Sequence, residues 1–378
     1  MNQLHDTIAA DIAGGRYDGA VTIVGIGGEI RHAAAQGLAD RDAGRALAED
    51  AVFPLFSISK SLTAICLLQM VERGRCRLNQ PVAEILPAFG ARGKATATLG
   101  QLLCHMAGVG PGFPAVAFDD LGDLEKVVQA VCDTPPVSVP GTAVSYAPVM
   151  AHAVAAECVR RLDGGGRRFR EIAETAILQP LGLAETSLGM RRDLVARAVR
   201  LRKADDSPGL FDLDGLVNYG KALLDPARDW EIPAGGFVST AGDVFRFAEA
   251  LRQGGCAEGD EGRRILSPAM LAFATANQTG DLPNDLWTYA RTLKNWPLFP
   301  ANLGLGFFLR GTGMIPTYFG HLASPATFGS LGAGSTVFWV DPARQMTFVC
   351  LTTGLLEEAN SAERFQRLSD VAIAEFWR

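Results

Sequence analysis

Residues 53–74 constrain the fold of this chain more than any other segment. They contain the S-x-x-K sequence Ser57-Ile58-Ser59-Lys60, followed by apolar residues that lie all round a helix. The pattern predicts a buried helix of about four turns that ends at Gly74. If Ser57 opens this helix, Lys60 follows nearly one turn later and lies beside Ser57 on the same face.

The pairing of a serine with a lysine predicts an activated nucleophile. A serine hydroxyl needs an adjacent base, and a lysine is such a base only where burial or nearby positive charge lowers its pKa. The start of a buried helix meets both conditions, and its free N–H groups suit a developing oxyanion. The same S-x-x-K sequence is a motif of class A β-lactamases and penicillin-binding proteins. The alternative is an ordinary helix start with Ser57 as its N-cap.

Composition and charge exclude several classes of partner. The chain has 378 residues, 48% of them hydrophobic and 20% charged, which is typical of a soluble globular protein with a substantial core. A formal net charge of −6 without basic runs argues against nucleic acid or a membrane surface as a partner. No segment approaches the roughly 18 apolar residues of a membrane span, and the N-terminus lacks the pattern of a signal peptide. We therefore expect a cytoplasmic protein.

The seven cysteines are scattered, and no C-x-x-C occurs. They are interpreted as small buried hydrophobic residues in a reducing compartment. Neither H-E-x-x-H nor a paired Cys/His spacing is present, so we expect no metal and no other cofactor. The sequence does not determine the oligomeric state, although a homo-oligomer is compatible with it.

Apolar periodicity and turn residues divide the chain into elements. Helices are predicted at 3–14, 57–73, 78–89, 98–107, 119–133, 148–162, 168–180, 241–252 and 361–377. Strands are predicted on either side of a turn at Gly27 and Gly28, and again at 303–310, 336–340 and 345–353. The segments 191–231 and 254–302 are irregular and rich in loops.

Strands at both ends of the chain with helices between them predict an α+β fold. We expect a central antiparallel sheet built from both termini and flanked by helices, with an inserted α-rich domain. The predicted domains are a discontinuous α/β sandwich of residues 1–75 and 233–378 and a mainly helical domain of residues 76–232.

Other polar and aromatic residues admit two interpretations each. His105 is a tempting catalytic residue, but a histidine near a helix C-terminus more often satisfies helix carbonyls and the helix dipole. Tyr146 is either a buried tyrosine with a bonded hydroxyl or a phenol that shares protons with Lys60. The aromatic residues of the long second loop either line a pocket or pack on a neighbouring element; they are Trp287, Tyr289, Trp296 and Phe299.

Six segments together resemble the serine β-lactamase-like superfamily, nearest its branch of class C β-lactamases and family VIII esterases. In chain order they are residues 57–60 (SISK) with the apolar helix, 102–108 (LLCHMAG), Tyr146 after Pro140-Gly141, 180–187 (PLGLAETS), 233–240 (PAGGFVST) and 338–342 (FWVDP). Each segment alone is a weak signal, whereas six in this order are strong, and the resemblance covers about residues 10–375.

The resemblance implies the β-lactamase/transpeptidase-like fold, with the site between the sandwich and the helical domain. It implies that Ser57 is the acylated nucleophile and that Lys60 is its base, aided by Tyr146. The backbone N–H groups of Ser57 and Ala333 would form the oxyanion hole. The third motif, with Phe328, Ser330 and Gly332, would contact the substrate.

Two positions depart from the family pattern. Pro148 stands where many members have an asparagine, and it has no side-chain donor. Ser330 stands where members have a lysine or histidine, so it offers no positive charge to a substrate carboxylate. This disfavours a β-lactamase or a D-peptidase.

The predicted function is therefore a serine hydrolase that forms an acyl-enzyme on Ser57 and hydrolyses a small-molecule ester. An ester leaving group needs less assistance than an amide nitrogen, so the missing cation matters least there. One alternative is acyl or amide transfer in small-molecule biosynthesis through the same acyl-enzyme. An alternative of another class is a binding protein of this fold that has lost turnover.

Overall fold

The structure is a computed structural model, and it describes residues 2–257 and 260–378. Its strands are β1 (Gly19–Ile26), β2 (Glu29–Asp40), β3 (Arg45–Ala46), β4 (Phe53–Pro54), β5 (Ser187–Leu188), β6 (Arg202–Lys203), β7 (Phe237–Ser239), β8 (Cys256–Ala257), β9 (Asp260–Arg264), β10 (Phe308–Leu309), β11 (Phe328–Gly332), β12 (Thr336–Asp341), β13 (Met346–Thr352) and β14 (Gly354–Leu355). Its α-helices are α1 (Gln3–Ala13), α2 (Ser59–Glu72), α3 (Leu99–Leu103), α4 (Leu124–Asp133), α5 (Met150–Leu162), α6 (Phe169–Ala173), α7 (Gln179–Leu181), α8 (Leu213–Leu223), α9 (Ala241–Arg252), α10 (Pro268–Ala274), α11 (Thr288–Lys294) and α12 (Glu358–Phe376).

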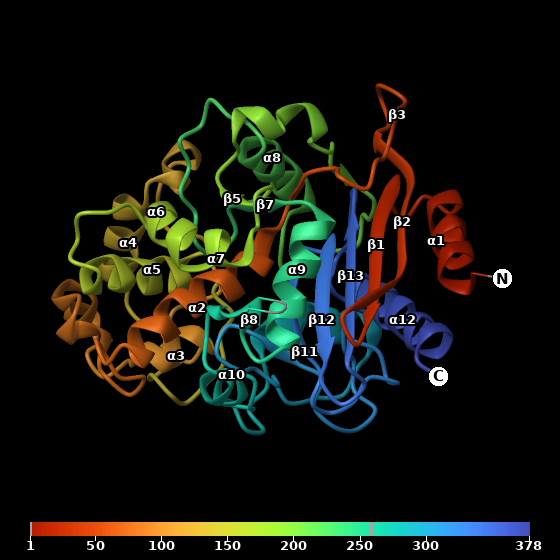
Figure 1. Cartoon of the computed structure of the whole chain (residues 1–378). Coiled ribbons are helices and arrows are strands. Elements are labelled where there is room, and N and C mark those ends of the chain that lie inside the picture. Colours follow the sequence, from red (N-terminus) through yellow and green to blue (C-terminus); the bar gives the residue numbers. More distant parts are fainter. Residues whose placement is uncertain (1, 258–259) are drawn as a thin grey trace.

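The central sheet joins the two ends of the chain. Its seven strands are antiparallel, in the order β10-β11-β12-β13-β1-β2-β3. The N-terminal hairpin meets the C-terminal strands where β1 pairs with β13, with Ile23 opposite Val349. Helices α1 and α12 lie on one face of the sheet and α9 on the other, so every residue of β13 is buried (Figure 1). The prediction of an antiparallel sheet built from both termini and flanked by helices is confirmed.

The helices between β4 and β7 gather beyond one edge of this sheet, around α4, α5 and α6 (Figure 1). Helix α2 lies between them and the sheet, and all its residues from Ser59 to Met70 are buried. A helix enclosed in this way needs apolar side chains on every face, as its sequence has. The division into two domains stays a prediction. None of the described helices is long and apolar enough to cross a lipid bilayer.

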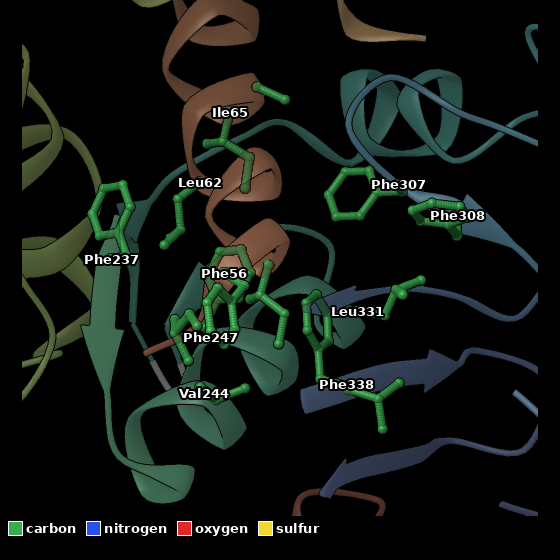
Figure 2. Packing of buried hydrophobic residues seen from close by; sticks show 14 of the residues in the cluster. Phe56, Leu62, Ile65, Phe237, Val244, Phe247, Phe307, Phe308, Leu331 and Phe338 are labelled. Atoms are coloured by element: carbon green, nitrogen blue, oxygen red, sulfur yellow. The ribbon is translucent and has the colours of Figure 1, made fainter. Parts of the chain in front are cut away.

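One part of the core holds the start of α2 in place. Side chains from α2, β7, α9, β11 and β12 meet around Phe56 (Figure 2). Phe247 of α9 packs against Phe338 of β12 with ring centroids 5.6 Å apart, in a T-shaped arrangement. Both rings are buried. Phe56, the residue before Ser57, is buried in this part of the core, and its ring stacks on that of Tyr219 with centroids 6.0 Å apart.

Several predicted elements differ from the structure. Ser57 does not open the α-helix: it lies in a 3-10 turn, Phe56–Ile58, directly before α2. Residues 78–89 form 3-10 turns rather than a helix, because prolines interrupt them. The segment 191–231 contains α8, which Asp212 caps. Only Phe308–Leu309 of the strand predicted at 303–310 pairs with the sheet.

Candidate active site

A strained turn positions Ser57 at the edge of a cavity. Phe56 has φ +48°, in the left-handed region that a phenylalanine rarely adopts. The Leu55 N–H donates to Phe237 O at 2.8 Å, and the Thr336 hydroxyl donates to Leu55 O at 3.2 Å. His105 and Ala333 also have positive φ, of 61° and 36°. Such strain persists where surrounding packing enforces it, and it concentrates at functional sites.

The amine of Lys60 lies against the Ser57 hydroxyl. Its Nζ is 2.8 Å from Ser57 Oγ, 2.7 Å from Pro148 O and 3.1 Å from Ala234 O. A neutral lysine has two N–H groups and one lone pair. If the two carbonyls accept the N–H groups, the lone pair faces the serine hydroxyl. This is the arrangement that a general base for Ser57 requires.

Burial changes the proton affinity of this lysine. Lys60 is only 3% exposed, and burial lowers its pKa to about 7. Among the described residues, no carboxylate contributes to the pKa of Lys60. Pro148 O and Ala234 O also accept hydrogen bonds from the protonated amine, so burial does not exclude the charged form of Lys60. Lys60 is therefore able to take up and release a proton near neutral pH.

Tyr146 lies close to both Ser57 and Lys60. Lys60 Nζ is 5.1 Å from the centre of the Tyr146 ring, and the phenol is buried. Burial raises the pKa of Tyr146 to about 12, and a hydrogen bond with the Ser57 side chain opposes this rise. The phenol therefore keeps its proton at neutral pH, and it is placed to donate that proton rather than to start as a phenolate.

The chain around Tyr146 is held by two side chains that sequence analysis did not assign to the site. The Asp285 carboxylate accepts from the Tyr146 N–H at 2.7 Å and from the Ser145 hydroxyl. His105 Nδ1 accepts from the Ala147 N–H at 3.1 Å, and its ring lies 4.5 Å from that of Tyr146. Asp285 is distant in sequence and lies within an irregular segment, so no local signal indicated it.

The preferred interpretation of His105, as a side chain that satisfies helix carbonyls and the helix dipole, is wrong. Its Nδ1 accepts a hydrogen bond instead of donating one. Burial and the nearby Lys60 lower the pKa of His105 to about 3. The imidazole is therefore neutral at pH 7 and has no positive charge to interact with the helix dipole. Buried His152 lies beside it, with ring centroids 5.3 Å apart, and its pKa is also held well below the ordinary value by burial.

The third-motif residues Phe328, Ser330 and Gly332 lie on one face of β11, and that face does not line the main cavity. Ser57, Tyr146 and Ala333 line the main cavity. Ser330 does not: its hydroxyl donates to Ser57 O at 3.3 Å, and it lines a smaller cavity with Lys60 and His105. Phe328 is buried against Phe307, and Leu331 reaches the main cavity instead.

Gly332 allows β11 to approach the turn before Ser57. A Cβ at this position would lie 2.2 Å from Leu55 O and 2.3 Å from Thr336 Oγ1, closer than real Cβ contacts come. We expect Gly332→Ala to lower the free energy of unfolding in urea by about 3 kcal/mol or more. Gly242→Ala is the control, since the nearest atom to its added Cβ is 3.8 Å away. Equal stability of the two variants would contradict this account of Gly332.

The main cavity encloses about 660 Å³ of space, open solvent included. Its walls are mostly apolar, with Phe56, Phe211, Leu216, Leu331 and Leu356 among the lining residues. Leu216 comes from α8, in the segment that was interpreted as irregular. The helical spacing of Leu213, Leu216, Tyr219 and Leu223 after the capping Asp212 was the signal that could have identified this wall.

The aromatic residues of the segment 254–302 pack rather than line this cavity. Trp287 contacts Trp296 and Phe299, with ring centroids 6.1 and 5.5 Å apart. Tyr289 is 51% exposed. Of the two interpretations, packing on a neighbouring element is the one that holds for the two tryptophans and Phe299.

Comparison with known proteins gives a consistent result. The family model described as Beta-lactamase matches residues 4–372. Penicillin-binding protein 4 of Amycolatopsis lactamdurans is 28% identical over 359 residues, covering 93% of this chain and 84% of that protein. Esterase/beta-lactamase LipL of Mycobacterium tuberculosis is 28% identical over 378 residues, covering 92% and 80%. The crystal structure of a penicillin-binding protein homologue from Caulobacter crescentus superposes with a TM-score of 0.80 at 25% identity, covering 98% of this chain and 96% of that one.

Proposed function

Because the chain belongs to the β-lactamase family of serine hydrolases, we propose that it hydrolyses a small-molecule ester through an acyl-enzyme on Ser57. The observation that carries this proposal is the contact between Ser57 Oγ and a buried Lys60, whose other two hydrogen-bond partners are backbone carbonyls. The roles of Ser57, Lys60, Tyr146 and Ala333 below are part of the proposal.

In the acylation step, the Ser57 oxygen attacks the ester carbonyl while its proton passes to the Lys60 amine. Negative charge develops on the former carbonyl oxygen, and the backbone N–H groups of Ser57 and Ala333 would stabilise it. The C–O bond to the alcohol then breaks. The proton that Lys60 took up returns to the leaving oxygen through the Tyr146 hydroxyl, so the alcohol leaves neutral.

Water completes the reaction by the reverse sequence of proton transfers. Its oxygen attacks the acyl carbon while its proton passes through Tyr146 to Lys60. The bond from the acyl carbon to Ser57 Oγ then breaks, and Lys60 returns the proton to the serine. Ser57, Lys60 and Tyr146 end in their starting states, and the products are one acid and one alcohol.

The residue at the cation position of the third motif supports an ester over a β-lactam or a D-peptide. Substrates of the latter kinds carry a carboxylate, for which a cation in the third motif is the usual partner in the family. Here Ser330 occupies that place, and its hydroxyl is directed to Ser57 O. An ester without a carboxylate needs no such cation.

The experiment that tests the proposal is labelling with a fluorophosphonate followed by mass spectrometry of the intact protein and its peptides. We expect one adduct, on Ser57, formed with loss of fluoride, together with turnover of p-nitrophenyl butyrate. A folded protein that forms no adduct and hydrolyses no ester would instead support the alternative of a binding protein that has lost turnover.

Tyr146→Phe tests the proposed proton transfer. We expect kcat/KM for ethyl butyrate, whose leaving alcohol needs a proton, to fall about 10²- to 10³-fold, because the substitution removes the hydroxyl but keeps the ring. Titration of the butyric acid released measures this rate. The control is Tyr289→Phe, since Tyr289 is 51% exposed and lies outside the cavity. An unchanged kcat/KM would exclude Tyr146 from this role.

Acyl transfer to an alcohol is the second candidate, and the apolar lining of the cavity favours it. Apolar walls hold little water and offer an organic acceptor a place beside the acyl-enzyme. Adding a primary alcohol during hydrolysis of p-nitrophenyl butyrate separates the two functions. A transferase would form mainly the new ester at millimolar alcohol, whereas a hydrolase would form mainly butyrate.

A further inference from the structure

The main cavity has a polar region at the start of α12. Glu358, the first residue of that helix, lines the cavity together with Ser361, one turn further along. Tyr318 lines the same cavity and comes from the segment before β11. All three side chains are more than nine-tenths buried, with exposed fractions of 8%, 1% and 2%.

Two of these three side chains lack a partner within the protein. Neither the Ser361 hydroxyl nor the Tyr318 hydroxyl has a hydrogen-bond partner in the part of the chain that the structure describes. A buried hydroxyl without a partner costs about 1–3 kcal/mol, and such groups are rare in folded proteins unless a ligand or water completes them. Both residues line the cavity, so a ligand group that reaches their oxygens would complete them.

The ionisable side chain at this end of the cavity is a carboxylic acid, Glu358. One carboxylate oxygen of Glu358 accepts from the Leu210 N–H at 3.2 Å. Burial and the neighbouring Glu357 carboxyl hold the pKa of Glu358 above its ordinary value. Glu357 itself caps α12, and Asp205 accepts from the Glu357 N–H at 3.1 Å. No lysine, arginine or histidine lines this cavity in the described residues.

This combination determines which substrate group fits. Glu358 retains an accepting oxygen whether or not it is protonated, and the two hydroxyls both accept and donate. A donor such as an ammonium or hydroxyl group would therefore find partners here. A carboxylate would be desolvated beside acidic side chains without a cation, which is unfavourable.

We propose that Glu358, Ser361 and Tyr318 bind a hydrogen-bond-donating group of the substrate, an amine or a hydroxyl, and that Glu358 excludes substrates with a carboxylate there. The proposal rests on the proposed esterase function and names the class of ester that the enzyme takes. Glu358 is thereby a specificity-determining residue, and it takes no part in the bond-breaking steps.

The experiment compares p-nitrophenyl esters that differ only in the far end of the acyl chain. The series is hexanoate, 6-hydroxyhexanoate, 6-aminohexanoate and the half-ester of adipate, repeated with eight-carbon chains so that chain length is also varied. The measured quantity is kcat/KM relative to the unsubstituted ester. In the parent protein we expect the amine or the hydroxyl ester to exceed the unsubstituted one about tenfold, and the carboxylate ester to fall about tenfold below it.

Glu358→Gln keeps the shape and the hydrogen-bonding atoms of the side chain but removes its acidity. In assays at pH 9, above the pKa of about 8 to which burial raises Glu358, we expect it to reduce the preference for the amine ester and to raise the relative kcat/KM of the carboxylate ester, each about tenfold. Glu363→Gln is the matched control: this glutamate of the same helix is paired with Lys294 at 2.7 Å and lies outside the cavity. We expect it to keep the parent pattern.

The outcomes separate the two proposals. Hydrolysis of hexanoate with an end-group pattern that Glu358→Gln does not alter would overturn the inference about Glu358 and leave the esterase function standing. Absence of hydrolysis of every ester, with no fluorophosphonate adduct on Ser57, would overturn the esterase function itself. A shifted pattern in Glu363→Gln as well would assign the effect to the general charge of α12 and would also contradict the inference.

Discussion

Replacing Ser57 with alanine is expected to reduce kcat/KM for p-nitrophenyl butyrate by a factor on the order of 10⁴ or more, and to abolish the fluorophosphonate adduct. Without the hydroxyl no acyl-enzyme forms, and Lys60 has no adjacent proton to remove. The residual rate would come from binding and oxyanion stabilisation alone. Steady-state hydrolysis and intact-protein mass spectrometry check both parts of this prediction.

Ser61→Ala is the matched control for this experiment. Ser61 lies in α2, directly after the turn that holds Ser57, and its hydroxyl donates to Gly306 O at 2.8 Å. We expect the variant to lose about 1 kcal/mol of stability and to keep the labelling of Ser57. If Ser57→Ala hydrolysed esters as fast as the parent protein, the activity would belong to another residue or to a contaminant.

Replacing Lys60 with methionine is expected to reduce kcat/KM by a factor on the order of 10³ or more, because a side chain of similar length remains but the base is lost. The parent protein should also show a distinctive pH dependence. Since burial lowers the pKa of Lys60 to about 7, the base is protonated below that pH. We expect kcat/KM to fall about tenfold per pH unit below pH 7 and to level off above it.

The residual activity of Lys60→Met should lack this decrease of kcat/KM below pH 7, the acidic limb of the pH profile, since the titrating amine is gone. A limb that persists in the variant would assign the ionisation to another group. An intact acidic limb together with near-parental activity would remove Lys60 from the role of base. Pre-steady-state measurements across pH 5–9 distinguish these outcomes from a change in the rate-limiting step.

The pH dependence of the stability of the same variant gives an independent measure of the pKa of Lys60. In the unfolded chain a lysine has its ordinary pKa of 10.5, whereas in the folded protein that of Lys60 is about 7. Between these values the unfolded state binds more protons, so the contribution of Lys60 to stability rises with pH. We expect the free energy of unfolding of the parent, relative to Lys60→Met, to rise by a few kcal/mol from pH 7 to pH 10. If the difference in free energy of unfolding did not change with pH, the pKa of Lys60 would be unperturbed in the folded protein.

The sequence by itself determined the features that depend on near neighbours. The apolar residues around α2 required a buried helix, and the S-x-x-K spacing brought Lys60 within reach of Ser57. The turn at Gly27 and Gly28 defined the first hairpin, and Thr240 caps α9 by accepting from the Asp243 N–H. These features follow from backbone geometry and side-chain spacing over a few residues, which a sequence displays directly.

The central sheet also followed from the sequence, although its strands lie at opposite ends of the chain. The apolar runs at 19–26 and 346–352 each needed partners, and sheets bury such runs. The order of the strands and their register depended on tertiary packing. The pattern of strands and helices predicted the α+β class, and the resemblance to the β-lactamase family supplied the specific fold within it.

Only the tertiary structure decided the environment on which the chemistry depends. The carbonyls that hold Lys60 belong to Pro148 and Ala234, 88 and 174 residues away. The positive φ of Phe56 arises from packing and from the approach of β11, and no local pattern predicts it. Desolvation and the supply of hydrogen-bond partners depend on which distant segments surround a group. Local sequence therefore identified Ser57 and Lys60, whereas the burial that lowers the pKa of Lys60 and the presence of Glu358 in the cavity emerged only from the folded chain.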